Sequence, residues 1–140
     1  MPRTKIDYAF TGEVIDSTHP TASGRWYAES AIDDIIKSVI DGKKYIIQEY
    51  SPLEREIKKI RADMVWTETI MGTCIAAEKK DGKLLMTFKC ASNKYGKRLK
   101  NLCESIGIRN LNLFPVGRGI ARDVSGKPVV SDYDLIYIAI

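Results

Sequence analysis

The C-terminal stretch "RNLNLFPVGRGIARDVSGKPVVSDYDLIYIAI", residues 109–140, decides the fold. Apolar runs at 109–117 and 128–140 flank an "SGK" turn at 125–127, and this pattern predicts two strands joined in a hairpin. In the second run, apolar residues occupy both alternating sets of positions. We therefore expect the last strand to be covered on both faces of its sheet.

A second hairpin is predicted in the middle of the chain. The run "ADMVWTETIMGTCIAA", residues 62–77, is rich in β-branched and aromatic residues and predicts a strand that includes Trp66 as a core residue. The Asp81-Gly82 pair is favoured in tight turns. After this turn, "KLLMTFKCA" at 83–91 returns as the partner strand.

Two shorter strands are predicted nearer the N-terminus. Alternation at 4–15 predicts one strand with a break near Gly12, and the turn-rich loop "DSTHPTASG" at 16–24 follows it. The segment "KKYIIQEY" at 43–50 predicts another strand, which Pro52 ends.

Two amphipathic helices accompany these strands. Apolar residues repeat at i, i+3 and i+4 through 27–40, and Gly42 is a plausible C-terminal cap. Asn93 can cap a second helix at 94–106, which Gly107 stops. The apolar residues predicted to share one face of this second helix are Leu99, Leu102, Cys103 and Ile106. Together, the elements predict an α+β domain with a mostly antiparallel sheet or small β-barrel and two packed helices.

Composition is that of a globular protein with one domain spanning residues 1–140. Hydrophobic residues make up 44% and charged residues 29%, and the net charge of +4 does not by itself indicate nucleic acid. No stretch approaches the roughly 20 apolar residues of a membrane span, and the N-terminus lacks a signal-peptide core. The cysteines have no metal-ligand spacing and are expected to be buried thiols; no metal and no cofactor is predicted.

The order of these segments resembles that of the prohead (capsid maturation) proteases of tailed bacteriophages. "GRWY" at 24–27 matches the family's N-G-R-x-Y-P stretch before its first helix, apart from the proline. "GKRL" at 96–99 matches its G-K-x-L helix, and "DYDLIYI" at 132–138 matches its closing d-Y-x-L-x-x-I strand. The similarity covers nearly the whole chain and implies a prohead-protease-like fold.

That resemblance implies a serine hydrolase, with a histidine in a D-H-P stretch after the first helix and a serine two residues before an R-G pair. In this chain "EYSP" places Ser51 at the histidine position, or Tyr50 if the register shifts by one. The "RG" pair at 118–119 places Val116 at the position of the nucleophile. Valine has no lone pair to attack a carbonyl, so we expect a chain that is not an enzyme.

A relocated catalytic dyad is the alternative that would preserve hydrolysis. His19 is the only histidine, so any His-assisted catalysis must use it. The serines considered as nucleophiles are Ser17, Ser23 and Ser51. A solvated loop histidine is the simpler interpretation.

Basic residues and one tryptophan are the candidate binding residues. Cations crowd the second helix, where they oppose its dipole and could face an acidic partner or a phosphate backbone. A solvated helix face is the simpler interpretation. Trp26 either packs at the domain edge or anchors a partner. The full set of candidates is Lys94, Lys97, Arg98, Lys100, Trp26 and Arg118.

Three functions follow from these observations. The first, which we favour, is a non-catalytic phage head protein: a decoration, cement or core component, made in the host cytoplasm and located in the virion. Its partners would be the major capsid protein or other head proteins in an oligomer or lattice, contacted by the loop at 16–26 and the tip near Ser125 and Gly126. The others are an accessory protein that binds a host factor, nucleic acid or nucleotide through the basic helix, and an active hydrolase using His19. Nucleic acid is not favoured as a partner.

Overall fold

Two long hairpins supply most of one mixed sheet. The computed structural model describes residues 7–50 and 64–140. One hairpin joins β4 (Gly72–Lys80) to β5 (Lys83–Cys90), and the other joins β6 (Phe114–Val124) to β7 (Lys127–Ala139). The predicted "DG" turn and the turn at 125–127 are confirmed, with positive φ at Asp81, Gly82, Ser125 and Gly126.

The strand order is β1-β5-β4-β3-β7-β2, and β6 pairs with the other edge of β7. The short strands are β1 (Ala9–Asp16), β2 (Trp26–Tyr27) and β3 (Ile46–Gln48). β2 and β3 run parallel to β7, and the other pairings are antiparallel. The predicted α+β fold with a mostly antiparallel sheet is therefore confirmed.

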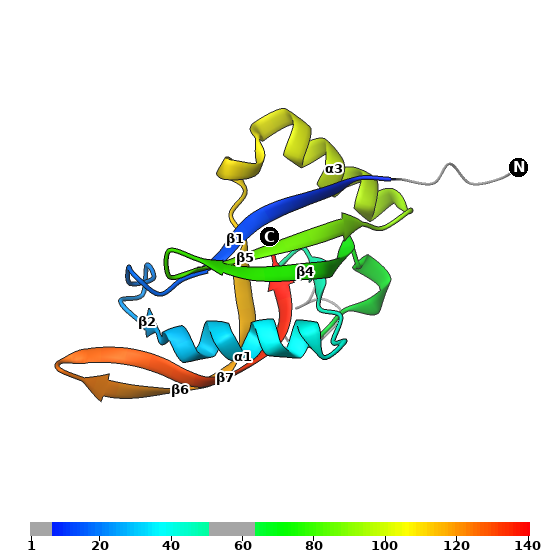
Figure 1. Cartoon of the computed structure of the whole chain (residues 1–140). Coiled ribbons are helices and arrows are strands. Elements are labelled where there is room, and N and C mark those ends of the chain that lie inside the picture. Colours follow the sequence, from blue (N-terminus) through cyan, green and yellow to red (C-terminus); the bar gives the residue numbers. More distant parts are fainter. Residues whose placement is uncertain (1–6, 51–63) are drawn as a thin grey trace, which may run out of the picture.

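The helices lie on different sides of the strands. Helix α1 (Glu29–Ile40) runs beside β4 and β7, whereas α3 (Lys94–Ile106) lies beyond β1 and β5 (Figure 1). Asn93 caps α3 by accepting a hydrogen bond from the Gly96 amide at 2.8 Å, and Gly107 ends the helix with φ of 84°, as predicted. Leu99 and Cys103 face the core, but Ile106 at the last position is 47% exposed, so it does not share their buried face.

Several predicted boundaries are wrong. Residue 27 was expected in the first helix, but it pairs in β2, and the helix begins at Glu29. The predicted strand at 62–77 starts only at Gly72, after a short 3-10 turn at Thr67–Thr69. Trp66 is nevertheless buried, so the apolar character of this run reflects burial of a loop rather than strand pairing. Residues 62 and 63 lie outside the described residues.

The other corrections concern strand lengths and Gly12. The strand predicted at 109–117 starts at Phe114, because a 3-10 turn at Ile108–Asn110 comes first. Gly12 lies inside β1, and the register shift falls between Glu13 and Ile15. A Cβ at Gly12 would meet the Leu113 side chain at 2.5 Å, so this glycine permits close packing rather than a break.

The β6–β7 hairpin bends and then projects from the sheet as an arm, residues 118–131 (Figure 1). A bulge lies where the register shifts between Arg118 and Ile120, and Asp132 opposite has φ of 48°. Buried Tyr137 and Ile138 show that β7 is covered on both faces only near its end. In the arm both strands are largely exposed, contrary to the expectation for the whole strand.

Candidate functional site

A groove with aromatic walls lies at the base of the arm. Its cavity volume is about 320 Å³. Its walls come from the start of β6, the bend of β7, β2 and the residues after β3. The lining residues are Arg25, Tyr27, Tyr50, Phe114, Pro115, Val116, Gly117, Gly119, Ala121, Val130 and Tyr133. We call it the aromatic groove.

The segment after β3 and the start of β6 pair with opposite edges of β7 near its end. The Tyr50 amide donates to the carbonyl of Ile140 at 3.1 Å. Phe114 of β6 pairs with the preceding residue, Ala139. The rings of Tyr50 and Phe114 then meet edge to face, with centroids 5.6 Å apart. Tyr50 and Val116, which are distant in sequence, therefore line one cavity.

The ring of Tyr133 lies against the backbone of β6. A Cβ at Gly117 would overlap the Asp134 carbonyl oxygen and would lie 2.9 Å from the Tyr133 hydroxyl. A Cβ at Gly119 would meet Tyr133 Cδ2 at 2.8 Å. The glycines of the "GRG" stretch are thus required by close packing and not by an unusual backbone conformation.

Tyr27 and Tyr133 form a neutral pair in this groove. Their rings are perpendicular, with centroids 5.4 Å apart. Burial raises the pKa of Tyr133 far above its ordinary value, and the neighbouring Tyr27 raises it further. Burial also raises the pKa of Tyr27. Neither phenol can therefore act as a general base near neutral pH.

The groove contains one of the two positions that the family resemblance implied to be catalytic, together with Tyr50. Val116 lines it, and so does Tyr50, the residue at the histidine position in the shifted register. Ser51 lies outside the described residues. Of the described lining residues, none is serine, threonine, cysteine, histidine, aspartate or glutamate. The described walls of the groove therefore hold neither a serine-type nucleophile nor a histidine or carboxylate base.

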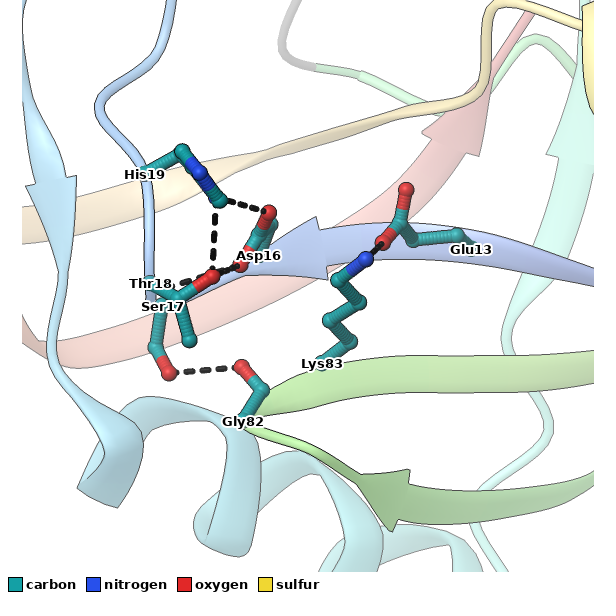
Figure 2. A network of polar contacts seen from close by, with 7 residues as sticks. All are labelled: Glu13, Asp16, Ser17, Thr18, His19, Gly82 and Lys83. Carbon is teal, nitrogen blue, oxygen red and sulfur yellow. Dashed lines mark hydrogen bonds and ion pairs between the residues drawn. The ribbon is translucent and has the colours of Figure 1, made fainter.

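His19 belongs to a polar network in the loop after β1 (Figure 2). Its Nδ1 lies 3.0 Å from Asp16 Oδ2 and 2.9 Å from the Thr18 hydroxyl. The Thr18 amide donates to Asp16 Oδ1 at 2.8 Å. Burial alone would raise the pKa of Asp16, but the hydrogen bonds from Thr18 and His19 outweigh it and lower that pKa.

The serines considered as partners of His19 bond elsewhere. The Ser17 hydroxyl donates to the Gly82 carbonyl at 2.6 Å, pointing away from His19 in Figure 2. The Ser23 hydroxyl lies 3.0 Å from that of Thr21. Among the described residues, no serine hydroxyl is hydrogen-bonded to the His19 ring.

The basic residues of α3 are mostly engaged with the chain itself. Arg98 pairs with Glu49 at 2.9 Å, and Lys100 lies 3.7 Å from Glu104. Lys94 lies over the ring of its neighbour Tyr95, with 5.2 Å to the centroid. Lys97 is exposed. This arrangement fits a solvated helix face better than a continuous phosphate-binding surface.

The two remaining candidates lie apart from α3. Arg118 is exposed on β6, opposite Asp134. Trp26 is half-buried in β2, and the Lys127 ammonium lies over its ring, 4.4 Å from the centroid. Trp26, Ser125 and the Asp81-Gly82 turn line a common cavity, so the structure does bring the loop at 16–26 and the arm tip together.

Other potential chemistry is limited in the described part of the chain. Cys74, Cys90 and Cys103 are buried and free, and burial is the main cause that raises the pKa of Cys90 to about 11. Residues 7–50 and 64–140 hold no group of three or more histidine, cysteine or acidic residues that could bind a metal. They also hold no helix long and apolar enough to cross a membrane.

Sequence reasoning missed the Tyr27–Tyr133 pair and the groove that it helps to form. The signal in the sequence was weak: it consists of Gly117 and Gly119, which flank Arg118 in β6, and Tyr133 in the facing strand. Only the observed register, with its bulge, places Tyr133 against these glycines.

Comparison with known proteins agrees with this architecture. No family model matches the chain. No curated protein matches it either. The solved structure of the bacteriophage T4 capsid assembly protease, gp21, superposes with a TM-score of 0.68 at 14% sequence identity, over 95% of this chain and 80% of the protease chain. The fold is of the prohead-protease type. The fold that the sequence resemblance implied is thereby confirmed.

Proposed function

We propose that this chain is a non-catalytic component of a phage head, acting in capsid structure or assembly by binding and not by hydrolysis. The observation that carries the proposal is the placement of Val116 and Tyr50 in one aromatic groove. In a serine hydrolase a nucleophile and its base must meet within hydrogen-bond reach. Here the implied nucleophile position holds a valine, and the groove walls are aromatic.

The aromatic groove is suited to an extended segment of another head protein. β6 pairs only with β7 among the described strands, and from Arg118 to Val124 it is exposed. An added strand could pair with this edge, while one of its side chains enters the groove. The major capsid protein is the first partner to test.

The test measures binding and cleavage together. The chain is mixed with the major capsid protein of the phage that encodes it, the complex is quantified by analytical ultracentrifugation, and both proteins are weighed by intact-mass spectrometry. We expect a complex with no new fragments. Tyr50→Ala should weaken the complex about tenfold, because an interface aromatic contributes roughly 1–2 kcal/mol. Ile106→Ala, which truncates an exposed residue of α3, is the matched control and should bind normally.

Cleavage of the capsid protein would contradict the proposal, and so would the absence of any complex. Equal weakening by Tyr50→Ala and Ile106→Ala would show that the groove is not the contact surface. Circular dichroism of each variant separates a local effect from loss of the fold.

A second candidate, an active hydrolase, is favoured by the contact between Asp16 and His19. A carboxylate beside Nδ1 orients a catalytic imidazole in many hydrolases and leaves Nε2 for a nucleophile. If cleavage is observed, His19→Ala should abolish it while Thr21→Ala should not. Cleavage that survives His19→Ala would exclude this candidate.

A further inference from the structure

A second cavity lies between the end of α1 and the β4–β5 hairpin, and it shares no lining residue with the aromatic groove. Its volume is about 420 Å³. Lys43 and Lys44 border it from the segment after α1, and Lys89 borders it from β5. Val39 and Ile75 add apolar surface. The cavity therefore combines three ammonium groups with aliphatic side chains.

A β-bulge turns Ile75 toward solvent at this place. Cys74 pairs with Phe88 and Ala76 with Thr87, so Ile75 is the extra residue of β4. The Cys74 thiol donates to the Ala76 carbonyl at 3.2 Å across the bulge. The Ile75 side chain is 56% exposed as a result. The bulge thereby adds a large aliphatic side chain to the cavity wall that Val39 and the lysines also line.

Within the described part of the chain, the lysines of this cavity form no ion pair with an acidic residue. Its lining contains no aspartate or glutamate, and in residues 7–50 and 64–140 neither Lys44 nor Lys89 forms an ion pair. Lys43 lies over the Tyr45 ring, 4.9 Å from the centroid. The surface thus carries positive charge beside exposed apolar side chains.

Two other lysines of the same two strands, Lys79 and Lys83, form ion pairs within the chain. The Lys79 ammonium lies 2.8 Å from Asp33, and the Lys83 ammonium lies 3.3 Å from Glu13. Lys89 differs from these two lysines, because its charge stays beside those of Lys43 and Lys44 around one cavity.

We propose that this surface, Val39, Lys43, Lys44, Ile75 and Lys89, binds an acidic amphipathic segment of a partner protein. Carboxylates of the segment would pair with the ammonium groups, and an aliphatic or aromatic side chain would cover Ile75 and enter the cavity. Nucleic acid is a poorer fit, because the surface has neither arginine forks nor exposed aromatic rings on which bases stack. This contact would act independently of the aromatic groove.

A selection of random peptides tests the proposal. The immobilised full chain is screened against messenger-RNA-displayed peptides of random sequence, and enriched peptides are synthesised and titrated by fluorescence anisotropy. We expect enrichment of peptides that combine Asp and Glu with large apolar residues. The double variant Lys44→Glu/Lys89→Glu and the single variant Ile75→Ser should each weaken binding about tenfold or more. The double variant Lys94→Glu/Lys97→Glu, at exposed positions of α3, is the charge-matched control and should change binding little.

The same titrations define the contrary results. Enriched peptides without acidic residues would overturn the proposal, as would acidic peptides whose affinity ignores Ile75→Ser. A short DNA duplex serves as the second probe. If it binds more tightly than the peptides and loses affinity with the lysine variant alone, the surface is a phosphate-binding one and the proposal is wrong. Circular dichroism confirms that each variant keeps its fold.

Discussion

Gly117 and Gly119 allow β6 to pack closely against β7, because neither residue has a side chain. Each position has an ordinary backbone conformation, so the glycines are not needed for a left-handed turn. They are needed because the Tyr133 ring occupies the space that a methyl group would take. Tyr133 in turn contacts Tyr27, and so these small residues position one wall of the aromatic groove.

Gly117→Ala should destabilise the protein by about 1–3 kcal/mol, because the added Cβ would overlap the Asp134 carbonyl and the backbone cannot yield cheaply. Urea denaturation followed by circular dichroism measures the change. Ile120→Ala, on the same strand but 51% exposed, is the control and should shift stability by less than about 0.5 kcal/mol. Equal stability of the two variants would show that the close approach of β7 does not exclude a side chain at residue 117.

The Asp16 network predicts a pH dependence. Because hydrogen bonds from Thr18 and His19 hold the pKa of the folded Asp16 carboxyl below the ordinary aspartate value of about 4, its ionised form stabilises the fold above that pH, and the contribution disappears as pH falls through the lower folded value. Asp16→Asn should therefore be less stable than the natural chain at about pH 5, and the difference should shrink as the pH falls below about 4. Stability measured by urea titration at several pH values checks this. A difference that stays constant with pH would contradict it.

Among the elements, both ends of α3 were predicted correctly, whereas the bounds of the strands were predicted only in part. Its limits depend on local chemistry, the Asn93 cap and Gly107, which a sequence displays directly. β2 has only two residues and exists because Val129 and Val130 of the distant β7 pair with it. No local pattern encodes such a pairing. The apolar run that contains Trp66 was misassigned because burial alone does not distinguish a packed loop from a strand.

The cap of α3 supplies the prediction at the scale of an element. Asn93→Ala removes the acceptor for the Gly96 amide and the amide donor to the Ile70 carbonyl, so stability should fall by about 1 kcal/mol. Thermal or urea denaturation measures the loss. Asn93→Asp keeps the acceptor and should retain most of the stability. If aspartate and alanine destabilise equally, the cap is not the source of the effect.

For the whole molecule, the sequence resemblance predicted the fold, and the T4 capsid assembly protease confirmed it. Two positions that the resemblance singled out, Val116 and the register-shifted alternative Tyr50, line the aromatic groove, whereas Ser51 lies outside the described residues. The shape of the groove could not be predicted, since it depends on the bulge opposite Gly119 and on the Tyr27–Tyr133 contact. The lysine cavity escaped prediction for the same reason: three separate segments form it.

The central claim, a non-catalytic role in the phage head, predicts where the chain is found. The most direct measurement is quantitative mass spectrometry of purified mature virions and immature heads of the encoding phage, which counts copies of this chain relative to the major capsid protein. We predict the intact chain in many copies: in the mature particle for a decoration or cement protein, or in immature heads alone for a core component. Absence of the chain from both particles would contradict the account.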